Sequence, residues 1–245
     1  MNLQDKTLEE RKKLTRAFPV LIAAFPNAGK SSAVEMLSDE DKARTVIYDL
    51  EGKGLPEDDE SQYRSMIKIK NVYENGTDYL YKDAGNVKYK DIDGIMMHMR
   101  KAIAHPDVDR IIIDSFSTLV DEFEKHYVTV SNGFASWIQY NKELYSWFRM
   151  LKEETYTHGK FVYVMSHYKP AKDPKDTESE KFTTVKGKDH FRMVESHFNT
   201  VLTIEDFKFK ADNMESFDST RIRRSLSPYE SKENSLAELE ISLSK

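Results

Sequence analysis

The stretch from residue 18 to residue 32 constrains the fold more than any other part of the sequence. An apolar run from Val20 to Ala24 predicts a short buried strand. A turn at residues 26–29 follows, and an amphipathic helix is predicted to begin at Lys30. A strand, a turn and a helix in this order form the layout of a phosphate-binding loop, in which backbone N–H groups and a helix N-terminus wrap a triphosphate.

The loop follows the pattern G-x-x-x-x-G-K-[S/T] except at its first position, where Ala24 replaces glycine. In this pattern Lys30 meets the β- and γ-phosphates, and the hydroxyl of Ser31 holds Mg²⁺. We therefore predict that ATP and Mg²⁺ are the ligands of this loop, with Ser31 contacting the metal ion. The residues predicted to bind the nucleotide are Pro26, Asn27, Ala28, Gly29, Lys30, Ser31 and Ser32. The replacement raises the question whether the loop has the usual geometry, because glycine adopts positive or negative φ where the chain leaves the strand, whereas alanine is restricted to negative φ. The alternative is a strand, turn and helix that contain Gly-Lys-Ser by chance.

Length and composition narrow the remaining choices. The 245 residues are 39% hydrophobic and 32% charged, which is enough for one large α/β domain or two small ones. The net charge is −5, from 37 basic and 42 acidic residues, so any contact with nucleic acid needs a local basic patch. The absence of cysteine excludes disulfides, cysteine-ligated zinc and thiol catalysis. No apolar run has the length of a membrane span or signal peptide, so we expect a cytoplasmic protein without membrane contact.

A second strand is predicted at residues 44–50, and it ends in carboxylates next to two glycines. Ligands of open parallel sheets bind at the carboxyl ends of the strands. A carboxylate at this edge can orient the attacking water beside a γ-phosphate. Glu51 is the predicted catalytic residue, Asp49 is the competing candidate, and a solvated turn acid is the alternative for Glu51.

A third buried strand is predicted at residues 110–115, and it ends in Asp114. A carboxylate at the end of an apolar strand is costly to bury unless it has partners. Asp114 is therefore predicted to hold Mg²⁺ opposite the hydroxyl of Ser31. The alternative is that Asp114 or Ser115 caps the next helix, and capping by Ser115 is compatible with the metal role.

Residues 160–167 predict another buried strand, which ends in His167. A hydrogen-bond donor at this edge can touch the γ-phosphate and report its loss to the loop that follows. That loop, residues 168–188, is rich in lysine and contains two prolines. The alternatives are a histidine at the margin of the core and a solvated loop without a ligand.

The rest of the chain predicts further elements of an α/β domain. The predicted strands are residues 65–72, 198–206, 207–210 and 219–226, and the predicted helices are residues 91–104, 116–130 and 134–155. The aromatic residues of 134–155 form either core, a subunit interface or a base-stacking platform. We expect a lead-in at residues 1–17, one domain at residues 18–228 and a polar tail at residues 229–245.

Taken together, the strand-end residues resemble those of the RecA-like branch of phosphate-loop ATPases. The resemblance rests on four segments in chain order: Gly29-Lys30-Ser31, Asp49-Leu50-Glu51, Ile113-Asp114-Ser115 and Ser166-His167. It implies a RecA-like α/β fold, with a mainly parallel central sheet flanked by helices and antiparallel strands at the C-terminal edge. It also implies that Glu51 is the catalytic glutamate, that His167 is the γ-phosphate sensor, and that Arg224 supplies a cation to the neighbouring subunit's γ-phosphate.

Within that branch the chain looks most like phage-encoded RecA-like ATPases, a group that includes single-strand annealing proteins. The resemblance implies ATP hydrolysis that acts on single-stranded DNA in recombination or annealing. It further implies a homo-oligomer, either a ring or a filament, with a single-strand-binding protein as an additional partner. Two alternatives remain open: a nucleotide-gated assembly or loader protein that hydrolyses ATP slowly, and a kinase-like phosphoryl transferase.

Overall fold

A computed structural model describes residues 19–25, 27–54, 61–68, 92–128, 133–167, 194–211 and 228–244 of the chain. The strands are β1 (Val20–Ala24), β2 (Thr45–Asp49), β3 (Ser65–Lys68), β4 (Arg110–Asp114), β5 (Phe161–His167), β6 (Thr200–Glu205), β7 (Lys208–Ala211) and β8 (Tyr229–Glu230). The helices are α2 (Lys30–Glu35), α3 (Asp39–Lys42), α5 (Ile92–Ala104), α6 (Phe116–Tyr127), α7 (Phe134–His158), the 3₁₀ helix η5 (Val194–His197) and α8 (Leu236–Leu243).

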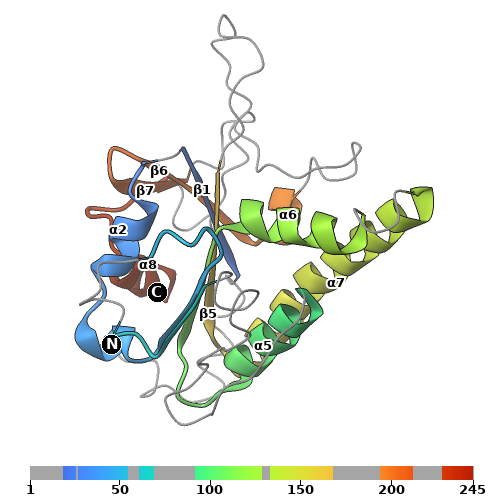
Figure 1. Cartoon of the computed structure of the whole chain (residues 1–245). Coiled ribbons are helices and arrows are strands. Elements are labelled where there is room, and N and C mark those ends of the chain that lie inside the picture. The colour runs from blue at the N-terminus through green and yellow to red at the C-terminus, as the bar shows by residue number, and fades with distance from the viewer. Residues whose placement is uncertain are drawn as a thin grey trace, which may run out of the picture.

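The described strands form one sheet in the order β3-β2-β4-β5-β1-β6-β7-β8. The strands from β3 to β6 in that order are parallel, and β7 and β8 are antiparallel at one edge. Figure 1 shows α2 and α8 on one face of this sheet and α5, α6 and α7 on the other. The prediction of an α/β fold with a mainly parallel, helix-flanked sheet and antiparallel edge strands is therefore confirmed.

The register of the parallel strands brings the predicted site residues to one edge of the sheet. Asp49 at the end of β2 is paired with Asp114 at the end of β4. Ala24 at the end of β1 is paired with His167 at the end of β5. Because all four strands run in the same direction, these residues lie at their common carboxyl edge.

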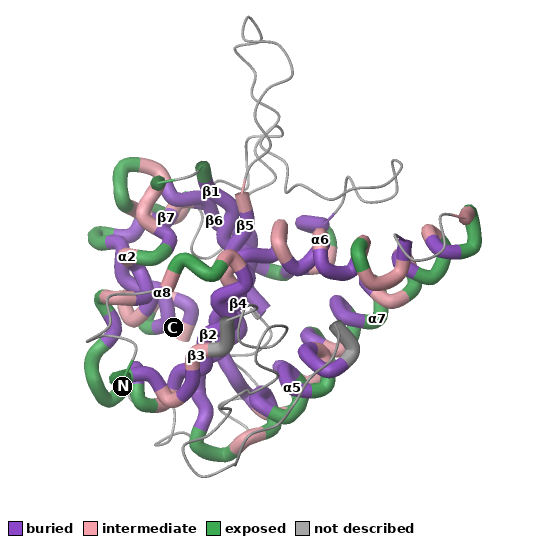
Figure 2. The backbone as a smooth tube through the Cα atoms, viewed as in Figure 1, coloured by how far each residue is buried: buried purple, intermediate pink, exposed green. Residues whose placement is uncertain are grey.

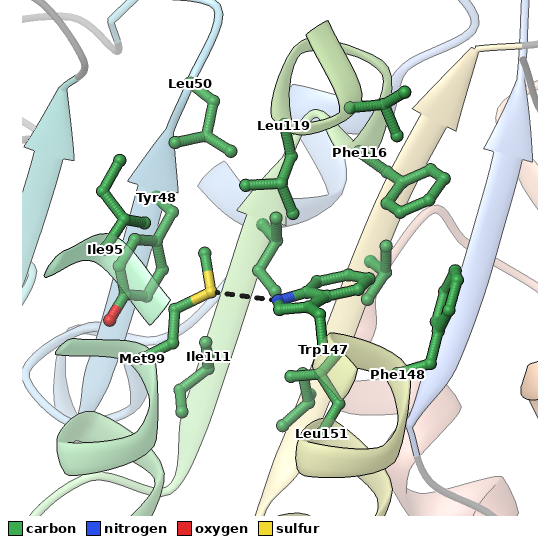
Figure 3. Close-up of a cluster of buried hydrophobic side chains, with 14 of the residues drawn as sticks. Tyr48, Leu50, Ile95, Met99, Ile111, Phe116, Leu119, Trp147, Phe148 and Leu151 are labelled. Carbon is green, nitrogen blue, oxygen red and sulfur yellow. Dashed lines mark hydrogen bonds between the residues drawn. The ribbon is translucent and has the colours of Figure 1, made fainter. Parts of the chain in front are cut away.

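Side chains alternate along each strand, so the sheet carries a core on each face. On one face, Trp147 and Leu151 of α7 pack beside Met99 of α5, and Trp147 Nε1 donates to the Met99 sulfur at 3.5 Å (Figure 3). On the other face, α2 and α8 cover strand positions that include Ile112 and Tyr163. Figure 2 shows that the central strands are buried along nearly their whole length.

The aromatic residues of α7 divide between core and surface. Tyr140 and Trp147 are fully buried and Phe148 is 4% exposed, so these rings are core residues. Phe134, at the start of the helix, is 83% exposed. The core interpretation is therefore confirmed for Tyr140, Trp147 and Phe148, whereas Tyr145 and Tyr156, which are 46% and 49% exposed, lie at the surface as Phe134 does.

The C-terminal segment differs from the predicted polar tail at residues 229–245. Strand β8 pairs with β7, and α8 buries Leu236, Leu239 and Leu243 in the core beside α2. The sequence showed only a weak amphipathic stretch here, because Glu238 and Glu240 interrupt the apolar residues. One of them, Glu240, is itself buried and paired. The C-terminal segment is therefore an integral part of the fold.

A buried ion pair fastens α8 to the sheet. Arg110 of β4 donates from Nε to Glu240 Oε1 at 2.5 Å, and its Nη2 donates to the other oxygen. The hydroxyl of Tyr163 donates to the same carboxylate at 3.0 Å, and Asp41 lies 2.8 Å from Nη1 of Arg110. Because each buried charge has partners, the polar groups fit inside an otherwise apolar layer.

Several predicted elements coincide closely with the observed ones, and others fall outside the described residues. The first strand has the predicted bounds, Val20–Ala24, and α7 continues three residues beyond the predicted end, to His158. The predicted lead-in at 1–17 and the predicted strand at 219–226 lie outside the described residues. None of the described helices combines the length and the apolar character needed to cross a bilayer.

The ion pair on α8 gives a direct test of the C-terminal packing. Glu240→Ala should lower the free energy of unfolding by about 3 kcal/mol, because Arg110 would stay buried with Asp41 as its remaining carboxylate partner. Ile241→Ala on the same helix is the control, since Ile241 is 50% exposed and its loss should cost less than about 0.5 kcal/mol. Urea unfolding measures both, and equal effects would contradict a buried role for Glu240.

Candidate functional site

The loop between β1 and α2 contains residues in the left-handed backbone conformation. Asn27 and Gly29 both adopt positive φ, at 64° and 100°, and Gly29 caps the N-terminus of α2. The Ala28 N–H donates to the carbonyl of Phe25 at 3.3 Å. Ala24 ends β1 and has no positive φ, so alanine fits there without strain. Pro26, which the sequence also assigned to this loop, lies outside the described residues.

Gly29 is required for its space as well as for its conformation. A Cβ added there would lie 2.8 Å from Asn234 Nδ2 and 2.8 Å from Cδ1 of Phe207, closer than real Cβ contacts. The Asn234 amide donates to the Gly29 carbonyl at 2.7 Å. The segment before α8 and the turn between β6 and β7 therefore both pack against the loop.

The ammonium group of Lys30 is buried beneath the loop. The residue is 6% exposed, and Nζ lies 3.2 Å from the Phe25 carbonyl, 3.4 Å from the Ala24 carbonyl and 3.2 Å from His167 Nδ1. Burial lowers the pKa of Lys30, whereas the carboxylates of Asp114 and Glu51 act in the opposite direction. The amine is therefore held at the carboxyl end of β1, within the predicted phosphate site.

His167 connects Lys30 to Glu51. Its Nε2 lies 2.6 Å from Glu51 Oε1, while its Nδ1 faces the Lys30 ammonium. An ammonium group can only donate, so Nδ1 accepts and Nε2–H donates to the carboxylate. The hydrogen bond from His167 holds the pKa of Glu51 well below its usual range, and Lys53 pairs with the same carboxylate. Glu51 is therefore ionised at neutral pH.

Asp49 has a different task from Glu51. Its two oxygens accept from the backbone N–H of Lys53 at 3.3 Å and of Gly54 at 2.7 Å. Asp49 thus closes the turn that carries Glu51, and its oxygens are occupied by the backbone. Glu51 is engaged as well, by His167 and Lys53, so the hydrogen bonds of the free protein do not distinguish the two carboxylates.

Asp114 lies at the end of β4 with an unsatisfied oxygen. Within the described part of the chain, its Oδ1 is buried without a hydrogen-bond partner. Burial, reinforced by the charges of Glu51 and Asp49, raises the pKa of Asp114 to about 6. The cap of α6 is Ser115, whose hydroxyl accepts from the Thr118 N–H at 3.4 Å. Capping therefore leaves the Asp114 carboxylate available for another role.

The donor set around Asp114 fits a small hard cation. Asp114, Ser31 and Asp49 line one pocket of about 20 Å³, which has room for roughly one water-sized species. Oxygen ligands are those that Mg²⁺ prefers, and magnesium is usually held by one or two carboxylates together with substrate phosphates. Among the described residues, no three His, Cys, Asp or Glu side chains gather to form a complete metal site. Ser31 and Asp114 would hold Mg²⁺ there only in part, and phosphate oxygens would complete the set.

The structure thus gathers Lys30, Ser31, Glu51, Asp114 and His167 at one edge of the sheet. Arg224, the predicted cation for a neighbouring subunit, lies outside the described residues.

The sequence did not predict that two further residues, Asn234 and Phe207, contact the loop. Ser235, which caps α8, is a helix-start signal that marked the neighbourhood of Asn234, whereas no sequence pattern indicated the position of Phe207.

Comparison with known proteins does not assign the chain to a family. No protein-family model matches it, and the search of the curated proteins gave no match.

Asp114 gives a prediction about pH and stability. Its folded-state pKa of about 6 exceeds the ordinary 3.8, so the folded protein binds this proton more tightly than the unfolded chain does. The free energy of unfolding should therefore fall as the pH rises from about 4 to about 6. Asp114→Asn removes this penalty and should stabilise the nucleotide-free protein by about 1–2 kcal/mol at pH 8, with little gain at pH 4.

Urea unfolding of both proteins at the two pH values, without Mg²⁺ or nucleotide, measures the effect. An equal increase in the free energy of unfolding at both pH values, or a decrease at pH 8, would contradict the conclusion that the folded protein disfavours the ionised form of Asp114.

Proposed function

We propose that the chain is a RecA-like phosphate-loop ATPase that binds and hydrolyses ATP. The observation that carries the proposal is the convergence of Lys30, Glu51 and His167, linked by contacts of 3.2 and 2.6 Å, at the carboxyl edge of the sheet. Ser31 and Asp114 line a pocket beside them. The mainly parallel sheet with antiparallel edge strands also agrees with the expected RecA-like fold.

Each residue has a separate task in this proposal. Lys30 exchanges its carbonyl and histidine partners for the β- and γ-phosphates, and the N–H groups of the loop surround the β-phosphate. Ser31 and Asp114 would hold Mg²⁺ in part, and the bound ion would neutralise charge on the phosphate oxygens. Because hydrolysis depends mainly on positioning and electrostatics, a strongly acidic carboxylate suffices for Glu51 to orient the attacking water.

His167 is suited to sense whether the γ-phosphate is present. When Lys30 turns to phosphate, His167 Nδ1 loses a donor that lies at 3.2 Å in the free protein. Its Nε2–H is shared with Glu51, so the change also reaches the water-orienting carboxylate. His167 is the last residue of β5, and the predicted 168–188 loop begins directly after it.

The resemblance to phage-encoded RecA-like ATPases extends the proposal to single-stranded DNA. In this proposal the protein acts on single-stranded DNA in recombination or annealing as a homo-oligomer, and Arg224 completes the neighbouring subunit's site. A single-strand-binding protein is a further proposed partner. ATPase assays with and without single-stranded DNA, together with filter binding across a salt series, test this part. Stimulation and a steep salt dependence are expected, and nucleotide binding without either would contradict the DNA role.

One observation favours a second function, a nucleotide-gated assembly or loader protein. In the free site Lys30 is engaged by His167, and Glu51 is engaged by both His167 and Lys53. A site whose groups are already paired must break these contacts before each turnover, which suits slow hydrolysis. Slow, DNA-independent turnover with tight ATP binding would favour this alternative.

Lys30→Ala should lower the ATP turnover rate by roughly 100-fold or more, because it removes the cation that faces the β- and γ-phosphates. Lys125→Ala is the matched control, since Lys125 is an exposed lysine of α6 paired with Glu122. A steady-state phosphate-release assay measures both variants. Unaltered hydrolysis in Lys30→Ala would rule out this site.

Glu51→Gln should retain ATP binding within a few-fold but lose roughly 100-fold in turnover, because the amide no longer attracts the attacking water as a charge does. Asp49→Asn keeps an oxygen that can accept from the turn and should lose less than about tenfold. Single-turnover hydrolysis and equilibrium ATP binding separate the two effects. Full activity in Glu51→Gln with loss in Asp49→Asn would identify Asp49 as the catalytic carboxylate instead.

A further inference from the structure

The turn between β6 and β7 carries an unusual residue beside the phosphate loop. Glu205 is paired with Lys208 in the antiparallel ladder, so Asp206 and Phe207 form a two-residue turn. Both have positive φ, 52° and 56°. Turns of this kind favour glycine at their second position because a side chain there is strained. Phe207 stands at that position, so the turn retains a bulky ring where glycine would be easier to accommodate.

The ring of Phe207 lies directly against the loop while remaining largely in solvent. Its Cδ1 and Cε1 atoms are 2.8 and 3.1 Å from the place where a Gly29 side chain would begin. The residue is 59% exposed. The strained conformation therefore does not serve to bury the ring. Instead it holds an aromatic surface against the outside of the phosphate loop.

The strand order determines which part of a nucleotide would reach this ring. Three groups are proposed to act on the γ-phosphate: Asp114 and His167, which end β4 and β5, and Glu51, which follows β2 by two residues. Strands β2, β4 and β5 all lie on one side of β1. Strands β6 and β7 lie on the other side of β1, and β6 runs parallel to β1, so their turn lies at the same edge of the sheet. A triphosphate with its γ-phosphate near His167 therefore extends its sugar and base toward the β6–β7 turn.

We propose that Phe207 is the platform on which the base of the bound nucleoside triphosphate stacks. This inference rests on the proposed ATP-binding function and adds the residue that contacts the base. Stacking on a ring contributes affinity for any base, because every base has a π-face. ATP and GTP should therefore depend on Phe207 to a similar degree.

Calorimetric titration in the presence of Mg²⁺, with ATP and inorganic tripolyphosphate as ligands, tests the proposal. Phe207→Ala should weaken ATP binding roughly tenfold and change tripolyphosphate binding less than about twofold, because only ATP carries a base. Phe207→Trp should retain ATP affinity. Phe134→Ala is the control for loss of an exposed phenylalanine, since Phe134 is 83% exposed on α7, and it should leave both affinities unchanged.

A second variant separates stacking from folding. Phe207→Gly should weaken ATP binding as Phe207→Ala does, yet keep or raise the melting temperature, because glycine adopts positive φ without strain. Equal losses for ATP and tripolyphosphate would show that Phe207 only supports the loop, and unchanged ATP affinity would show no base contact. Either result overturns the inference while the ATP site stands. A wild-type protein that binds neither ligand would overturn the proposed function and this inference together.

Discussion

The buried ammonium of Lys30 is the contact on which the candidate site depends. It joins the carbonyls at the end of β1 to His167 at the end of β5, and His167 in turn holds Glu51 after β2. Three strands are thus connected at one edge by a single chain of polar contacts. Removing Lys30 would leave two carbonyls and a histidine without their shared donor. The residue that holds the free site together is thus the one proposed to bind phosphate.

The charges around Lys30 suit the site to bind a cation and an anion at the same time, the cation at Asp114 and the anion at Lys30. Asp114 keeps a buried oxygen without a partner among the described residues, and its pKa is raised by burial, reinforced by the charges of Glu51 and Asp49. A divalent cation would satisfy that oxygen and favour its ionised form. The same cation would also favour the approach of a triphosphate to Lys30. In the free protein the ionised form of Asp114 is therefore disfavoured, and a strongly perturbed pKa of this kind is typical of functional sites.

Much of the fold and the central site residues could be predicted from the sequence, because buried parallel strands are short apolar runs and their last residues share an edge. Val20–Ala24 and Asp114 were found in this way. The buried α8 was missed because the partner of Glu240 is Arg110, 130 positions away, and such pairings leave no local pattern. Phe207 was missed for a similar reason, since only the folded turn places it beside Gly29. Local periodicity thus indicates elements and their ends, whereas long-range contacts between side chains require the structure.

The most direct test of the central claim is a crystal structure of the protein with Mg²⁺ and a non-hydrolysable ATP analogue. The account predicts that Lys30 Nζ leaves His167 Nδ1 and contacts the β- and γ-phosphates, with Mg²⁺ between Ser31 and Asp114. It also predicts that Glu51 faces the γ-phosphate. A nucleotide bound elsewhere, or a phosphate group in the loop with Lys30 still 3.2 Å from His167, would contradict the account.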